Sequence, residues 1–151
     1  MRSRIKVTPT VTAGAYSIYD VIGGRLQFIG VRSARLQSVT IADKANQVVD
    51  YVLIFFESAP TNITDNNPYT IADADLSKIV YECDFAGLAA QGIVVARSFT
   101  DNRYTFIYKL DVPIQTAGGD LYAFLYTTGT PTYASTSDIT VTIQIEQAVK
   151  E

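Results

Sequence analysis

The most regular alternation of hydrophobic and polar residues lies near the end of the sequence. From position 139 to 146, hydrophobic and polar residues take turns: Ile139, Thr140, Val141, Thr142, Ile143, Gln144, Ile145 and Glu146. Side chains of a β-strand point to opposite faces in turn, so this pattern predicts a strand with one buried and one solvated face.

Shorter strands are predicted over residues 4–8, 25–29, 36–41, 48–56, 79–85, 104–111 and 121–126. The unbroken hydrophobic run at 51–56 favours a central strand covered on both faces. Turn-forming residues lie at 43–46, 100–102 and 118–120. The short connection at 43–46 predicts that strands 36–41 and 48–56 form a hairpin. A short helix is predicted near residues 73–78, with Asp73 as its N-cap.

These elements, about eight strands and one short helix, predict an all-β fold, a jelly-roll-like antiparallel β-sandwich. Residues 1–24 contain Pro9 and a small-residue run, and they end at Gly23 and Gly24. We therefore expect an extended N-terminal arm over 1–24 and a β-sandwich domain over 25–151. Fully extended, such an arm could span about 80 Å at ~3.3 Å per residue.

The composition excludes several classes of partner. Of the 151 residues, 48% are hydrophobic and only 18% charged, and the net charge is −3. A nucleic-acid-binding domain is expected to be strongly basic, so no nucleic acid is expected as a partner. No hydrophobic run approaches the ~20 residues of a membrane span, and no signal peptide is evident. We expect no membrane partner and synthesis in the cytoplasm.

The sequence offers little for catalysis. It contains no histidine and one cysteine, Cys83. Serine and cysteine nucleophiles commonly use a histidine base, and typical zinc sites use histidine or several cysteines. Phosphate-loop and dinucleotide-binding motifs are absent. We predict no enzymatic activity, no catalytic residues, no cofactor and no metal, and we expect Cys83 in the core.

Two chemical alternatives stay open. A hydrolase with paired carboxylates would draw on Asp20, Asp43, Asp50, Asp73, Asp75 or Asp84. The segment 65–67, Asp-Asn-Asn, supplies oxygen ligands that suit calcium, although it lacks the longer ligand pattern of an EF-hand. Turn formation explains the same residues.

Candidate partner-binding residues lie in the first part of the chain: Arg2, Arg4, Lys6, Tyr16 and Tyr19. The three cations alternate along an extended segment. They either solubilise a terminus or dock on an acidic partner surface, adding a strand to its sheet. Tyrosine, of which the chain has ten, is favoured at interfaces because its ring is apolar and its hydroxyl is polar.

Two stretches resemble small virion-associated proteins of tailed bacteriophages: YDVIGG at 19–24 and DNNPYTIADADL at 65–76. The resemblance extends over residues 16–111. It implies a capsid decoration, or cement, protein with a β-sandwich or β-tulip body. Such proteins often form homotrimers on the capsid surface of the virion and clamp neighbouring major capsid protein subunits. The resemblance implies no catalytic residues.

A different virion component is the main alternative: a tail, baseplate or fibre module with carbohydrate binding. A jelly-roll body and abundant tyrosine would suit that role.

Overall fold

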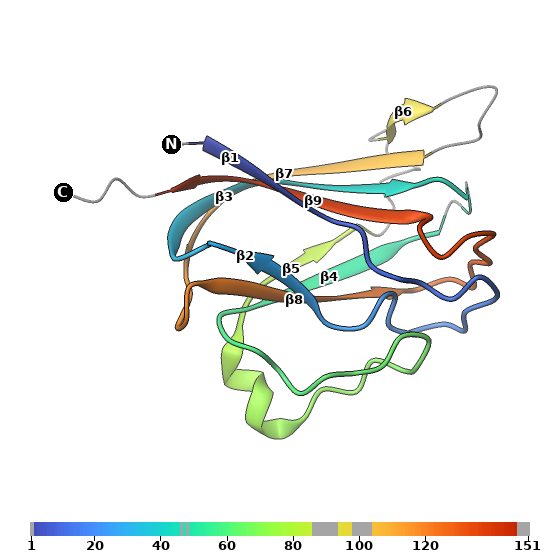
Figure 1. The fold of residues 1–151 in the computed structure, drawn as a ribbon, viewed down its shortest axis with the longest axis horizontal. Helices are drawn as coiled ribbons and strands as arrows, with labels where there is room; N and C mark the ends of the chain where they lie inside the picture. Colours follow the sequence, from blue (N-terminus) through green and yellow to red (C-terminus); the bar gives the residue numbers. More distant parts are fainter. Residues whose placement is uncertain (1, 46, 48, 86–93, 98–103, 148–151) are drawn as a thin grey trace.

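The computed structural model describes residues 2–45, 47, 49–85, 94–97 and 104–147, and only the backbone for 94–97 and 104–107. Nine strands in this part form two antiparallel sheets that pack face to face (Figure 1). The five-stranded sheet has the order β1 (Arg2–Val7), β9 (Ile139–Gln147), β3 (Ser33–Asp43), β7 (Tyr104–Gln115), β6 (Val94–Arg97). The four-stranded sheet has the order β2 (Leu26–Ile29), β8 (Asp120–Thr127), β4 (Tyr51–Phe56), β5 (Ile79–Asp84).

The strand order is that of a jelly roll with one added strand. β6 is terminal in its sheet and pairs with β7. Without it, the two sheets have four strands each, β1-β9-β3-β7 and β2-β8-β4-β5, and strands next to each other in sequence lie in opposite sheets, except β4 and β5. The predicted jelly-roll-like antiparallel sandwich is confirmed.

The main core lies between the two sheets. In β9 the hydrophobic residues Ile139, Val141 and Ile143 are fully buried, and the polar residues between them face outward, as the alternation predicts. Inward-facing residues of β3 and β8 complete the layer: Leu36, Val39, Ile41, Leu121, Ala123 and Leu125.

β4 is buried on both faces, as predicted for a central strand. Leu53 and Phe55 belong to the core between the sheets. The alternate residues of β4 join a second cluster on the outer side of the four-stranded sheet: Val21, Val52, Ile54, Phe56 and Phe124. Partly buried residues Ile63, Tyr69 and Ile71 of the segment 57–72 pack against this second cluster.

The predicted hairpin of 36–41 and 48–56 is wrong. β3 pairs with β7 and β9, whereas β4 pairs with β5 and β8, so the connection crosses from one sheet to the other. At the end of β3 the buried carboxylate of Asp43 accepts hydrogen bonds from the backbone N–H groups of Ala45 and Gln47. These bonds turn the chain away from its own sheet.

The first segment also differs from the prediction. Residues 2–24 are largely extended, but they belong to the sandwich and do not project from it as an arm. β1 pairs along its whole length with β9, and Val11, Tyr16 and Ile22 are buried in the main core. Burial of these apolar residues ties the segment to the body of the sandwich.

The short helix is a 3₁₀ helix, η1 (Asp73–Lys78), at the predicted place. Its N-cap residue is Ala72 and not Asp73, and no side chain caps it. The predicted turn at 100–102 lies outside the described residues. Of the residues described, none belongs to a helix that is long and apolar enough to cross a bilayer.

Candidate functional site

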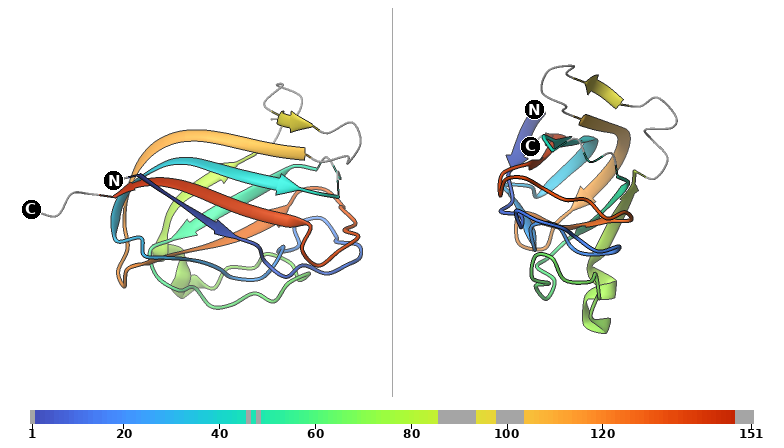
Figure 2. Two further views of the ribbon diagram at one scale, coloured as in Figure 1. Left: turned by 45° about the horizontal axis from the view of Figure 1, so that its top comes forward. Right: turned by 90° about the vertical axis from the view of Figure 1, so that its right-hand side faces the viewer.

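The outer face of the five-stranded sheet is polar, and most of its charged residues are cations. Its described charged residues, here called the basic sheet face, are Arg2, Arg4, Lys6, Arg35, Lys109, Asp111 and Glu146. The strands that carry them lie side by side in one curved layer (Figure 2). The register aligns Arg4 with Gln144, Gln144 with Ser38, and Ser38 with Lys109, in one row across four strands.

The charge of this face is opposite to that of the chain. Five cations and two anions give the face +3, whereas the whole chain carries −3, so the remainder carries −6. Arg35 donates to Asp111 at 2.7 Å, and both side chains remain largely exposed. Such an exposed pair contributes little to stability. The face therefore presents a positive field to an approaching partner.

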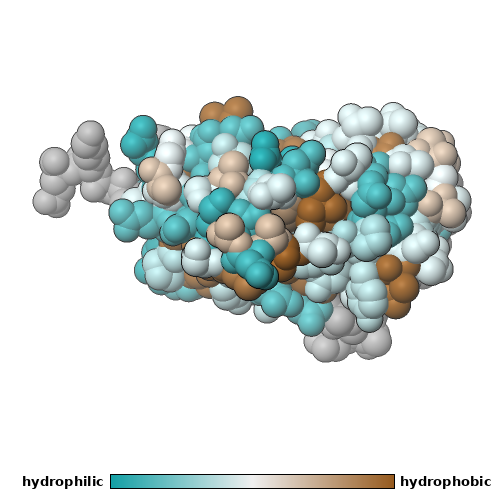
Figure 3. All heavy atoms as spheres, turned by 90° about the horizontal axis from the view of Figure 1, so that it is seen from below, coloured by the Kyte–Doolittle hydropathy of each residue, from teal (hydrophilic) through white to brown (hydrophobic). Residues whose placement is uncertain are grey.

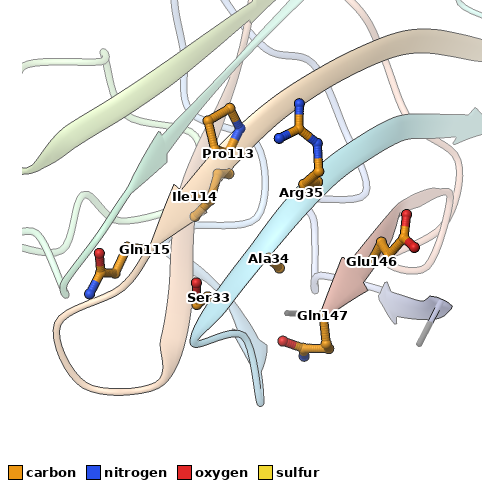
Figure 4. A pocket seen from close by; sticks show the side chains of 8 residues that line it. All are labelled: Ser33, Ala34, Arg35, Pro113, Ile114, Gln115, Glu146 and Gln147. Carbon is orange, nitrogen blue, oxygen red and sulfur yellow. The ribbon is translucent and has the colours of Figure 1, made fainter. Parts of the chain in front are cut away.

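Two shallow hollows lie on this face. One is lined by residues of the central row, including Arg4, Ser38, Lys109 and Gln144. The other lies near the sheet end where β3 begins (Figure 4), lined by Ser33, Ala34, Arg35, Pro113, Ile114, Gln115, Glu146 and Gln147. Their lining is mixed and open to solvent, which suits contact with a flat surface better than enclosure of a small ligand.

The three cations predicted for partner binding lie together on β1. Arg2, Arg4 and Lys6 are exposed and alternate with the half-buried Ser3, Ile5 and Val7. β1 is the terminal strand of its sheet, and among the described strands only β9 pairs with it. The predicted residues thus form a basic edge strand, fixed to the body by β9.

Tyr16 does not lie at the surface. Its side chain is buried, and its ring packs edge-on against Tyr133 with the centroids 5.4 Å apart. Its hydroxyl donates to Asp65 at 2.6 Å and accepts from the Thr12 backbone N–H. Burial is the main reason that the pKa of this hydroxyl is raised. Tyr16 therefore presents no exposed ring to a partner, because its ring fills the core.

Tyr19 does lie at the surface, with 54% of it exposed. Its φ of +70° is uncommon for a residue with a bulky side chain. Two backbone hydrogen bonds hold that conformation: Tyr19 N–H donates to Thr127, and Tyr69 N–H donates to the Tyr19 carbonyl. The ring meets Tyr126 edge-on at 6.4 Å, and Tyr126 stacks on Tyr69 at 4.8 Å.

Two exposed carboxylates, Glu82 and Asp84 on β5, lie near this tyrosine group. The register aligns Tyr126 with Val52 and Val52 with Asp84. Both carboxylates help to raise the pKa of Tyr126, after burial of its ring. We call Tyr19, Tyr69, Tyr126, Glu82 and Asp84 the acidic tyrosine patch. On this side of the molecule, hydrophobic residues form small separate groups (Figure 3).

Tyr69 also has an unusual hydroxyl. The oxygen is covered and has no hydrogen-bond partner in the part of the chain that the structure describes. Burial, Tyr126 and Glu82 raise its pKa to about 12, so it stays protonated at neutral pH. A covered hydroxyl without a hydrogen-bond partner lowers the stability of the folded state, unless another interaction offsets that loss.

The buried carboxylates considered for hydrolysis stabilise turns and the short helix. Asp20 accepts from the Ser17 N–H, Asp43 from Ala45 and Gln47, and Asp75 from the Thr61 N–H at 2.8 Å. Asp75 also pairs with Lys78 at 2.7 Å, which holds the pKa of its carboxyl below the usual range. The other candidates, Asp50, Asp73 and Asp84, lie before β4, at the start of η1 and at the end of β5.

The candidate calcium segment 65–67 has a structural role. Asp65 accepts three hydrogen bonds of 2.6 Å each, from Thr12 Oγ1, the Tyr16 hydroxyl and the Gly23 N–H. Asn67 donates to nearby backbone carbonyls. Within the described residues, no three carboxylate, cysteine or histidine side chains come together to hold an ion.

Cys83 lies in the core, as predicted. Burial, with a smaller contribution from Glu82, raises the pKa of its thiol to about 12. The thiolate is the reactive form of cysteine, so this side chain acts as a small apolar residue.

Comparison of the chain with protein-family models finds no matching family. Comparison with curated proteins finds no matching relative.

Proposed function

We propose that this protein is a structural, non-enzymatic virion protein that binds the outer surface of a phage capsid. It stabilises the shell by clamping neighbouring major capsid protein subunits, and it does so as a homotrimer. It is made in the host cytoplasm and resides on the capsid surface. The observation that carries the proposal is a broad basic sheet face on an otherwise acidic jelly roll. The sequence resemblance at 19–24 and 65–76 supports it.

A clamp needs a rigid body with an extended contact surface. The basic sheet face lies on paired strands. β3 and β9 pair from Ala34 and Gln147 at one end to Asp43 and Ile139 at the other, so the side chains of the face are held on one sheet. Shallow contacts on such a face are weak singly, and several copies acting together multiply them. Its positive field steers the protein toward an acidic surface.

Three of the residues that could carry chemistry are buried, which supports a structural function. Asp43 and Asp75 are buried and bonded to backbone N–H groups, and Cys83 is a protonated core thiol. None of the three offers an exposed group to a substrate.

Co-sedimentation with expanded, undecorated capsids tests this function. The wild-type protein should sediment with the capsids in a saturable, salt-sensitive way. Lys109→Glu reverses the charge in the central row and should weaken binding about tenfold. The matched control Arg32→Glu reverses an exposed charge in the β2–β3 connection and should bind as wild type. If the wild-type protein does not sediment with capsids at low salt, the function is wrong.

A tail, baseplate or fibre module with carbohydrate binding is the second candidate. The exposed ring of Tyr19, beside Tyr126 and the two carboxylates of β5, is the observation that favours it. Sugars pack on aromatic rings and hydrogen-bond to acidic side chains. A glycan array that gives no signal, together with antibody labelling of heads and not tails, would dismiss this candidate.

A further inference from the structure

Two surfaces of opposite charge lie on opposite sides of the sandwich. The basic edge strand, β1 with Arg2, Arg4 and Lys6, ends the five-stranded sheet. The acidic tyrosine patch lies on the outer side of the four-stranded sheet, and its carboxylates belong to that sheet's terminal strand, β5. Seen along the strands, β1 and β5 are at opposite sides of the molecule (Figure 2, right). The two surfaces cannot meet within one molecule.

We propose that the basic edge strand of one copy binds the acidic tyrosine patch of a second copy, while Arg35 and Lys109 of the basic sheet face remain turned toward the shell. This contact rests on the self-association included in the proposed function, but it does not need the capsid. Because the two surfaces differ, the contact is head-to-tail, and repeated contacts close into a ring or continue as an open chain.

The chemistry of the two surfaces is complementary. Arginine and lysine side chains bind both carboxylates and the faces of tyrosine rings. The patch offers two exposed carboxylates beside the ring of Tyr126 and the exposed ring of Tyr19. The same sheet already binds one cation in this way, since the Arg25 guanidinium lies 5.6 Å from the centroid of the Tyr122 ring.

The backbone supports the same contact. The free edge of β1 presents N–H and C=O groups that no described strand pairs. Native proteins often protect such an edge with charged side chains. Here the three cations all point to one face of β1, so they leave the edge accessible while selecting an acidic partner.

The oligomeric state of the full chain tests the contact without any capsid. Light scattering after gel filtration and sedimentation velocity would be measured in 50 mM and 500 mM NaCl. The wild-type protein should self-associate at low salt and dissociate at high salt, because salt screens exposed charges. Arg4→Glu and Glu82→Lys should each weaken association about tenfold.

The double variant R4E/E82K gives the decisive result. It exchanges the two charges, so association should return toward the wild-type level. Two controls, Arg32→Glu and Asp73→Lys, reverse exposed charges elsewhere and should associate as wild type. Thermal unfolding of each variant would verify that it folds.

Three results would overturn the contact: a wild-type monomer at every salt concentration, association unchanged by either single variant, or no recovery in the double variant. A monomer would mean that the cations of β1 only protect the sheet edge. Capsid binding by a monomer would leave the proposed attachment to the shell intact and remove this contact. Self-association without capsid binding would leave this contact intact and remove the proposed attachment to the shell.

Discussion

At the scale of single residues, Asp65 joins two segments that are distant in sequence. Its carboxylate accepts from Thr12, Tyr16 and Gly23, so it fixes the first segment against the loop that covers the four-stranded sheet. The sequence suggests Asp65 as a turn former or a calcium ligand. It cannot show that the donors come from residues more than 40 positions away.

Replacement of Asp65 should therefore destabilise the fold. Asp65→Ala leaves three donors without their acceptor, and we expect the free energy of unfolding to fall by about 2–4 kcal/mol. Urea denaturation measures this change. The exposed Asp73 is the matched control, and Asp73→Ala should change stability by less than about 0.5 kcal/mol. Equal effects of the two variants would contradict the role of Asp65.

The Asp75 carboxylate should make stability depend on pH. Lys78 and the Thr61 N–H lower its pKa in the folded state. A lowered pKa means that the stabilisation is present above the unfolded value, about 3.9, and is lost as the pH falls through the folded value.

Urea denaturation between pH 6 and pH 2 checks this dependence. Asp75→Asn should be less stable than wild type at pH 6, and the difference should shrink toward pH 2. Two curves that stay parallel over this range would show that the carboxylate charge is not the cause.

At the scale of elements, the periodicities of single strands are readable from the sequence and their partners are not. β9 and β4 behave as their patterns predict, because burial of one face or two faces is a local property. The partner of β3 depends on the direction that the chain takes after Asp43, whose carboxylate accepts bonds from the N–H groups of Ala45 and Gln47. Turn residues of the same types would serve a hairpin equally well.

The outer cluster explains why β4 needs apolar residues on both faces. Phe124 of β8 is fully buried and meets Phe56 and Tyr69 edge-on. Phe124→Ala should lower the free energy of unfolding by about 3–5 kcal/mol, because it leaves a cavity beneath the segment 57–72.

Thermal or urea unfolding measures that loss, and hydrogen exchange locates it. The amide of Tyr69, which bonds to the Tyr19 carbonyl, should lose protection in Phe124→Ala. The control is Ile29→Ala, since Ile29 is 72% exposed and its replacement should change stability by less than about 0.5 kcal/mol. A stable Phe124→Ala variant would mean that the segment does not depend on this cluster.

At the scale of the whole molecule, the account depends on where the charges lie. The sequence suggests Arg2, Arg4, Lys6, Tyr16 and Tyr19 as partner-binding residues because they combine alternating cations with tyrosines in one extended segment. All of them except Tyr16 lie at the surface. The sequence cannot place Arg4 in one row with Lys109, or Tyr126 in one row with Asp84, because only the register of the sheets aligns these residues. The spacing of Glu82 and Asp84, two residues apart on a strand, is the local signal that they share a face.

Cryo-electron microscopy of expanded capsids incubated with the purified protein tests the central claim most directly. We expect jelly-roll density on the outer shell surface, bridging neighbouring major capsid subunits, with the basic sheet face toward the shell. Capsids that remain bare at saturating protein concentration, or density that contacts the shell through another face, would contradict the account.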